Sequence, residues 1–278
     1  MAGKITVPHV RSRKGGEKLA VVTAYDTPTA RIADAAGVDM ILVGDSLANV
    51  VLGYEDTLRV DMDVMVHHTA AVARAGTNAL VIGDMPWMSY HVSIEDAVRN
   101  AGRFIREGGA GAVKLEGGRK RVPVVEAIID AEIPVMGHLG LTPQSVHAMG
   151  GYKVQGKTSA AARELLADAL ALAEAGVFSM VLEGIPDLLA EMVTKEVPVP
   201  TIGIGAGNDT DGQVLVFHDV LGLNTGHLPK FVRQYANLYG VAVDALRHYV
   251  ADVRSGGFPS DDESYHMGEQ AAAELLGR

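Results

Sequence analysis

Three things are scarce in this chain of 278 residues: cysteine, basic charge and long apolar runs. The complete absence of cysteine excludes disulfides, thiolate nucleophiles and cysteine-ligated zinc. Acidic residues outnumber basic ones by 34 to 24, and the formal net charge of -10 argues against binding to nucleic acid or to an anionic membrane. No apolar run approaches the roughly 20 residues of a membrane span, and residues 1–18 lack the apolar region of a signal peptide. We therefore expect a soluble, cytoplasmic protein whose partners are small molecules.

The chain does contain eight short apolar runs, most of which end near glycine or an acidic residue. These strand candidates are residues 19–26, 40–46, 79–85, 112–118, 134–140, 178–184, 200–207 and 212–219. Most are nearly continuous in apolar residues, as strands covered on both faces are, and amphipathic segments rich in alanine, leucine and charge lie between them. Eight such repeats in this length favour a (β/α)8 barrel over an open doubly wound sheet, which would fit six or seven strands better.

No linker rich in serine or proline divides the chain, so residues 1–278 are predicted to form a single barrel domain. Residues 223–278 would be a C-terminal helical extension and tail, in which residues 231–256 have the pattern of two helices. Five apolar residues there recur at helical spacing: Phe231, Val232, Tyr235, Leu238 and Tyr239. Such a stripe should be buried, either against the end of the barrel or against a neighbouring subunit.

Polar residues close the predicted strands: Asp26, Asp45, Asp84, Glu116, His138 and Glu183. The C-terminal ends of barrel strands line the active site, so these side chains should gather on one rim. Any single one is explained about equally well as the N-cap of a helix, and Asp26, beside the helix start at Thr27 and Pro28, fits that explanation best. Several carboxylates in one cavity would raise each other's pKa unless a cation neutralised them. Mg²⁺ suits such a site, since it leaves positions for water or for the oxygens of a 2-keto acid.

Lys114 and Glu116 are two residues apart on one predicted strand, so their side chains face the same side. The lysine could neutralise a substrate carboxylate there, whereas a structural Lys–Glu pair is the alternative. A Schiff-base role is disfavoured, because adjacent carboxylates raise the pKa of a lysine. Glu183 ends the sixth strand outside the proposed metal site and is the candidate base, with a helix-capping or ion-paired glutamate as the alternative. His138 is the next candidate to accept the proton.

Nine segments, in order and without large gaps from about residue 19 to 260, resemble the ketopantoate hydroxymethyltransferase family. They are TAYD, LVGDSL, GDMPWMSY, VKLEGG, GHLGLTPQSV, GGYKVQGK, VLEGIP, IGIGAGNDTDGQVLVFHD and LGLNTGHLPKF. The resemblance implies a barrel of the phosphoenolpyruvate/pyruvate superfamily and a cytoplasmic homo-oligomer, which is a decamer in many bacterial members. It also implies a Mg²⁺-dependent transfer of a one-carbon unit from 5,10-methylenetetrahydrofolate to 3-methyl-2-oxobutanoate, giving 2-dehydropantoate for pantothenate biosynthesis.

The same resemblance gives the site residues their expected roles. The metal site is expected at three carboxylates: Asp45, Asp84 and Glu116. The predicted substrate-binding set has five members: Asp45, Ser46, Asp84, Lys114 and His138. Glu183 takes the role of general base. In the tail, FPSDDESYH at residues 258–266 places Glu263 where the family has histidine, which leaves closure of the site by the tail in question.

Two other functions share part of this pattern. One is a Mg²⁺-dependent keto-acid lyase or aldolase of the same superfamily, but the lyases generally use a cysteine-bearing loop and this chain has no cysteine. The other is a non-catalytic barrel that only binds a keto acid. The chain keeps a costly group of charges together, which a scaffold has no reason to do.

Overall fold

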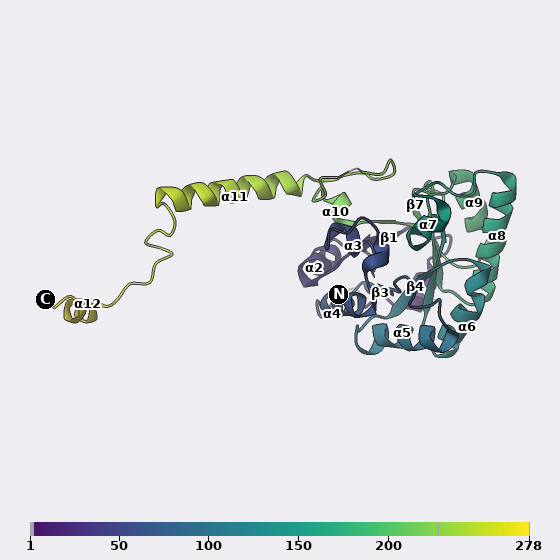
Figure 1. Ribbon diagram of the computed structural model, residues 1–278, viewed down its shortest axis with the longest axis horizontal. Coiled ribbons are helices and arrows are strands. Elements are labelled where there is room, and N and C mark those ends of the chain that lie inside the picture. Colours follow the sequence, from purple (N-terminus) through teal and green to yellow (C-terminus); the bar gives the residue numbers. More distant parts are fainter. Residues whose placement is uncertain (1–2, 227, 278) are drawn as a thin grey trace.

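In a computed structural model, which describes residues 3–226 and 228–277, eight parallel strands close into a barrel in chain order (Figure 1). The strands are β1 Leu19–Thr23, β2 Met40–Val43, β3 Leu80–Asp84, β4 Ala112–Glu116, β5 Val135–Gly140, β6 Ser179–Glu183, β7 Thr201–Ile204 and β8 Gly212–Leu215. Each lies within one of the eight predicted apolar runs, and the predicted barrel is confirmed. Every residue of β3 and β4 is buried, as expected for strands with a filled barrel interior on one face and helices on the other.

Helices of very different lengths connect the strands and continue beyond the last one. They are α1 Val7–Ser12, α2 Thr27–Ala35, α3 Leu47–Val50, α4 Met62–Ala73, α5 Ile94–Arg106, α6 Val122–Asp130, α7 Val146–Met149, α8 Ser159–Glu174, α9 Asp187–Glu196, α10 Phe217–Val220, α11 Leu238–Ser255 and α12 Glu269–Leu275. Three 3-10 turns add η1 Thr57–Arg59, η2 Arg119–Arg121 and η3 Pro143–Ser145. Within the described residues, no helix combines the length and apolarity needed to cross a membrane.

Asp26 belongs to a helix start and not to the pocket. Its carboxylate accepts a hydrogen bond from the Thr29 backbone N–H at 2.8 Å, while Thr29 bonds back to the Asp26 backbone in a capping box. The cap of α2 is therefore Asp26, and Thr27 is the first helical residue. Of the six polar residues at predicted strand ends, Asp26 is the one that the capping alternative explains.

Gly83 explains why a glycine precedes the aspartate at the end of β3. A Cβ atom at this position would lie 2.3 Å from Cδ1 of Phe104, which is fully buried on α5. The aromatic ring therefore packs directly on the backbone of β3, and any side chain at residue 83 would push α5 away. Because successive strand residues point to opposite faces, Asp84 points into the barrel while Gly83 meets the helix layer.

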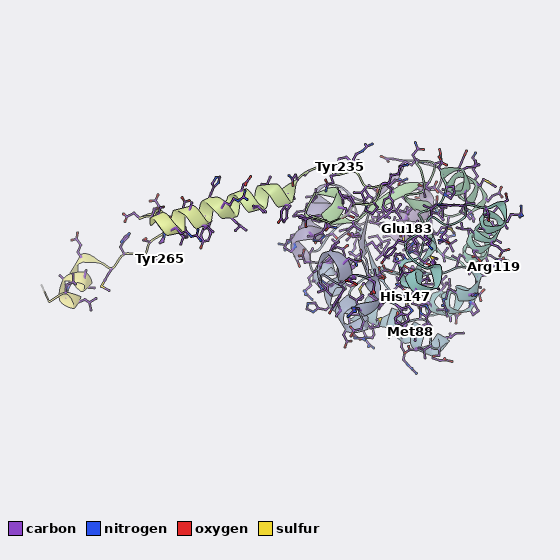
Figure 2. All side chains as sticks on the ribbon, turned by 45° about the horizontal axis from the view of Figure 1, so that its top comes forward. Met88, Arg119, His147, Glu183, Tyr235 and Tyr265 are labelled. Carbon is purple, nitrogen blue, oxygen red and sulfur yellow. The ribbon has the colours of Figure 1, made fainter. Side chains whose placement is uncertain are left out.

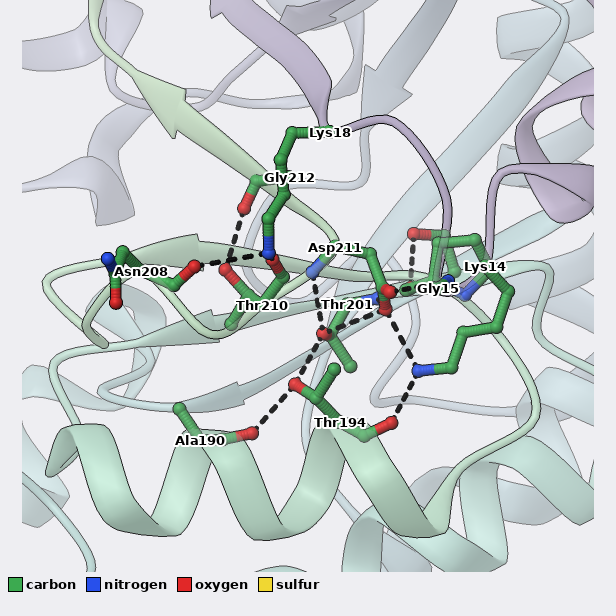
Figure 3. Close-up of polar contacts among 12 residues, drawn as sticks. Lys14, Gly15, Lys18, Ala190, Thr194, Thr201, Asn208, Thr210, Asp211 and Gly212 are labelled. Atoms are coloured by element: carbon green, nitrogen blue, oxygen red, sulfur yellow. Dashed lines mark hydrogen bonds and ion pairs between the residues drawn. The ribbon is translucent and has the colours of Figure 1, made fainter.

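The N-terminal end of the barrel is closed by hydrogen bonds centred on Asp211 (Figure 3). Its carboxylate accepts hydrogen bonds from Lys14 Nζ, from the Gly15 N–H and from the Thr201 N–H, each at 2.9 Å. Burial alone would raise the pKa of Asp211, but these donors outweigh it and hold the pKa below its ordinary value. The segment after α1 is thereby fastened to the loop between β7 and β8, a position in a barrel that serves stability.

We expect Asp211→Asn to lower the free energy of unfolding by about 3 kcal/mol, because the amide loses the ion pair and turns a donor toward other donors. Since the folded-state pKa of Asp211 is lowered, its contribution is fully present above the ordinary pKa of about 4 and is lost as the pH falls through the lower folded-state value. Urea unfolding at pH 7 and at pH 3 measures both effects. The exposed neighbour Asp209, changed to Asn, is the control; equal stability of the two variants at pH 7 would contradict the assigned role.

The chain leaves the barrel after α10 and extends away from it through α11 and α12 (Figure 1). The prediction of two helices in residues 231–256 is wrong, because this range holds only α11. Residues 235–239 instead run along residues 220–222, where the N–H groups of Tyr235 and Tyr239 bond to the carbonyls of Val220 and Gly222. The predicted apolar stripe is not buried within this chain either, since Tyr235 is 70 % and Tyr239 is 50 % exposed.

The ring of helices is incomplete between β8 and β1. No helix lies between β7 and β8, where residues 205–211 are all described, and only the four residues of α10 directly follow β8, whereas a helix of nine or more residues follows each of β1 to β6. Ala20 of β1 and Gln213 of β8 are paired in register and are both exposed, unlike any residue of β3 or β4. We call this surface, made by the outward residues of β1 and β8, the open seam.

Candidate active site

A cavity of about 170 Å³ lies at the C-terminal ends of the strands. The seven side chains predicted for the site all line it: Asp45, Ser46, Asp84, Lys114, Glu116, His138 and Glu183. Five strands or the residues just after them supply these groups, and Glu183 at the end of β6 lies within the barrel body in Figure 2. The C-terminal ends of the barrel strands thus bring together residues that are up to 138 positions apart in the sequence, from 45 to 183.

Asp45 and Asp84 are both buried in the cavity, with 5 % and 1 % of their surfaces exposed. The Asp45 backbone N–H donates to Oδ2 of Asp84 at 3.1 Å. Desolvation is the main reason that the pKa of each carboxyl is raised to about 6, and the nearby charge of Glu116 adds to this effect at Asp45. These two aspartates are therefore costly to ionise without a compensating positive charge.

Lys114 supplies one such charge, since its Nζ lies 2.8 Å from Oδ1 of Asp84. Burial favours the neutral amine, but Asp84, Glu116 and Asp45 together raise the pKa of Lys114 above its ordinary value. The side chain is therefore an ammonium ion at neutral pH. This agrees with the expectation that it attracts a carboxylate, and it argues against a neutral amine that would form a Schiff base.

His138 bridges two carboxylates on opposite sides of its ring. Its Nδ1 lies 3.4 Å from Oε1 of Glu116, and its Nε2 lies 3.2 Å from Oε2 of Glu183. Burial and the charge of Lys114 lower the pKa of His138, but the two glutamates outweigh them and raise it to about 9. The imidazole is consequently protonated at neutral pH and holds Glu183 by an ion pair. The side chain of Glu183 is 15 % exposed, compared with 3 % for His138, so it remains accessible from the cavity.

The donor set fits a hard cation. Oδ1 of Asp84 and Oε1 of Glu116 are buried atoms that accept no well-directed hydrogen bond, although the Lys114 ammonium lies near the first. Across residues 3–226 and 228–277, no three His, Asp or Glu side chains already form a cluster that would hold a metal. Buried carboxylate oxygens of this kind are the ligands that a hard divalent cation takes, with water or substrate oxygens completing its coordination.

Several residues that support the cavity were not predicted as site residues. Tyr25 OH lies 2.8 Å from Oγ of Ser46, Gln144 Nε2 donates to Oδ2 of Asp45 at 3.0 Å, and Tyr152 lines the cavity from the loop after α7. Tyr25 lies two residues after the end of β1. The rule that the C-terminal ends of barrel strands line the active site could therefore have found it. Gln144 and Tyr152 lie in loops with no strand pattern, and only the motifs that contain them gave a signal.

The closed parallel barrel and the charged cavity at the C-terminal ends of its strands define a (β/α)8-barrel enzyme. Two solved structures share this fold. Phosphonopyruvate hydrolase matches with a TM-score of 0.60 and 15 % identity, over 99 % of this chain and 95 % of its own. 2,3-Dimethylmalate lyase, a member of the PEP mutase/isocitrate lyase superfamily, matches with a TM-score of 0.59 and 18 % identity, over 98 % of this chain and 94 % of its own. These similarities show the (β/α)8-barrel fold, as predicted.

Sequence comparison is more specific. The model of the ketopantoate hydroxymethyltransferase family matches residues 4–261. The 3-methyl-2-oxobutanoate hydroxymethyltransferase of Syntrophobacter fumaroxidans is 58 % identical over 100 % of this chain and 98 % of its own length. The enzyme of the same name from Syntrophomonas wolfei is 55 % identical over 98 % and 99 %. The chain belongs to the ketopantoate hydroxymethyltransferase family and is a transferase, which sets aside the lyase and the non-catalytic barrel.

Proposed function

We propose that the chain transfers a hydroxymethyl group from 5,10-methylenetetrahydrofolate to 3-methyl-2-oxobutanoate, giving 2-dehydropantoate. The observation that carries the proposal is the cavity itself, which combines an ammonium ion, buried carboxylates and an accessible glutamate in a chain of this family. A small 2-keto acid has matching chemistry, since its carboxylate needs a cation and its C3 hydrogen needs a base.

The keto acid is held at its carboxylate end. Lys114 brings a positive charge, and Ser46 brings a hydroxyl that the Tyr25 phenol, 2.8 Å away, keeps in place. Mg²⁺ held by Asp45, Asp84 and Glu116 would supply Lewis-acid polarisation of the 2-keto oxygen and so acidify the C3 hydrogen. The positive charges of Lys114 and of a bound cation would also compensate the buried carboxylates of the cavity. Two of these, Asp84 and Glu116, each have an oxygen that accepts no well-directed hydrogen bond.

Glu183 is the base in this proposal. Its carboxylate removes the proton from C3, and the electron pair of that C–H bond becomes the enolate, whose C3 then bonds to the methylene carbon of the folate. One of the two C–N bonds of that methylene carbon opens to make it electrophilic. Water replaces the remaining folate nitrogen, its hydroxyl going to the methylene carbon and its proton to the tetrahydrofolate that leaves. His138, at 3.2 Å from Oε2, orients Glu183 throughout, and its protonated imidazole leaves the C3 proton to the carboxylate.

A direct assay tests the function. The protein is mixed with 3-methyl-2-oxobutanoate, 5,10-methylenetetrahydrofolate and Mg²⁺, and 2-dehydropantoate is measured by mass spectrometry. Product should form only when both substrates are present. When the methylene carbon of the folate is isotopically labelled, the label should appear in the hydroxymethyl carbon of the product. Failure to form labelled product in the complete mixture would overturn the proposed reaction.

We also propose that the chain is a cytoplasmic homo-oligomer, a decamer by its family resemblance, whose residues 223–277 join the copies. No residue of α11 is buried within one chain, yet one face of it carries apolar residues at alternating spacings of four and three: Tyr239, Val243, Leu246, Val250 and Val253. Apolar residues at that spacing form one face of a helix, which packs against another element. The open seam of a second copy lacks a covering helix, so α11 of one chain would complete the ring of another.

Light scattering at micromolar concentration should give a mass that is a multiple of the 29.3 kDa chain. A double change on the apolar face, Leu246→Asp with Val250→Asp, should lower that mass, because two charges would then be buried in the contact. His248→Asp, at an exposed residue on the opposite face of the helix, is the matched control and should assemble normally. A monomeric wild-type chain would rule out the assembly.

A further inference from the structure

Gln144, in the turn η3 after β5, is 5 % exposed and uses both polar groups of its side chain and its backbone N–H. Its Nε2 donates both to Oδ2 of Asp45 and to the backbone carbonyl of Met85, each at 3.0 Å. Its backbone N–H donates to Oε2 of Glu116 at 3.1 Å. One residue therefore holds two carboxylates of the cavity, from strands β2 and β4, although it belongs to neither strand.

Tyr90 fixes which way the amide of Gln144 faces. The phenol, 1 % exposed, accepts the backbone N–H of Glu116 at 3.2 Å and has a single proton, which it donates to Oε1 of Gln144 at 2.6 Å. Oε1 is thus committed to Tyr90, so the two N–H groups of the amide must face Asp45 and Met85. All of these groups are satisfied, and such a complete buried network has a single arrangement.

We infer that Gln144 is a positioning residue that presents Asp45 and Glu116 to a divalent cation. It binds one oxygen of each carboxylate, and Oε1 of Glu116, which faces the His138 imidazole at 3.4 Å, accepts no well-directed hydrogen bond in the buried cavity. The carboxylates are thereby oriented before any ion arrives, which lowers the cost of ordering them on binding. Partners of this kind commonly change metal affinity by 10- to 100-fold. The inference rests on the proposed function, because it assumes that these carboxylates hold the cation.

A purely structural role, in which Gln144 only fastens the loop after β5, makes a different prediction. Loss of a buried hydrogen-bond network lowers stability wherever the network lies. It changes metal affinity only if the network sets the position of the ligands. Melting temperature and Mg²⁺ affinity, measured on the same variants without substrates, therefore separate the two roles.

The experiment is a calorimetric titration of the full chain with Mg²⁺ alone. Gln144→Met keeps the length of the side chain and removes the amide, and we expect its dissociation constant to rise by about 10- to 100-fold. Gln213→Met is the control, since the amide of Gln213 also donates twice, to the Gly207 carbonyl at 2.8 Å and to Thr210 Oγ1 at 2.9 Å, but on the exposed outer face of β8, away from the cavity. Its Mg²⁺ affinity should equal that of the wild type.

Tyr90→Phe provides a second variant that removes a single hydroxyl and carries the test if Gln144→Met does not fold. It should weaken Mg²⁺ binding in the same direction by several-fold. A folded Gln144→Met, or failing that a folded Tyr90→Phe, with wild-type Mg²⁺ affinity and a lower melting temperature would overturn the inference. Absence of Mg²⁺ binding by the wild type would instead overturn the metal site of the proposed function.

Discussion

Glu183→Gln should bind Mg²⁺ and 3-methyl-2-oxobutanoate as the wild type does, yet lose deuterium exchange at C3 in heavy water by at least about 100-fold. Glutamine keeps the shape of the side chain but cannot accept the proton. The exchange needs no folate, so it isolates proton removal from group transfer. NMR of the keto acid with the enzyme and Mg²⁺ follows the exchange directly.

Two further variants define the result. Glu191→Gln makes the same change at a surface residue that pairs with Lys195 on α9, and it should exchange at the wild-type rate. If Glu183→Gln also exchanges at that rate, another group takes the proton. His138 then becomes the residue to substitute, because this variant removes one of the two carboxylates that keep its imidazole protonated.

Asp84→Asn should weaken Mg²⁺ binding by about 100-fold and weaken keto-acid binding with it, while the barrel still folds. The substitution preserves size and removes a charge that burial makes costly, as the pKa of about 6 indicates. Lys114 keeps the charges of Glu116 and Asp45 nearby, so it is not left as an isolated buried cation. Titration with Mg²⁺ and then with the keto acid measures both losses.

The control for this variant is Asp211→Asn, which makes the same substitution in a buried carboxylate at the opposite end of the barrel. It should lose stability and keep its affinity for Mg²⁺. Unchanged Mg²⁺ affinity in folded Asp84→Asn would reject Asp84 as a metal residue.

The barrel and most of the cavity were predictable because both follow from local pattern. Continuous apolar runs mark strands that are buried on both faces, and the polar residue that ends each run must face the common rim. Asp45, Asp84 and Glu183 could therefore be placed near one another from the sequence alone. Their exact roles as ligand or base rest on family resemblance and on the proposed chemistry.

Features set by contacts between distant segments were not predictable. Residues 231–239 have helical spacing in the sequence, but residues 231–237 lie outside α11, which Asn237 caps through the Gly240 N–H. The backbone of Tyr235, Leu238 and Tyr239 bonds instead to residues 220–222. Gln144 likewise follows no periodic pattern, and its importance appears only once β2 and β4 stand beside it. Periodicity reports burial along one element, and it carries no information about which other segment supplies a hydrogen bond.

The direct packing of Phe104 on Gly83 connects helix α5, outside the barrel, to Asp84 in the cavity. Because no side chain separates the Phe104 ring from the backbone of β3, a shift of α5 would also move the peptide that carries Asp84. The position of the Asp84 carboxylate therefore depends partly on how this ring packs outside the barrel. Substitutions on the inner face of α5 can thus alter catalysis without touching the cavity. A search for variants with changed activity should include this helix, which a map limited to pocket residues would leave out.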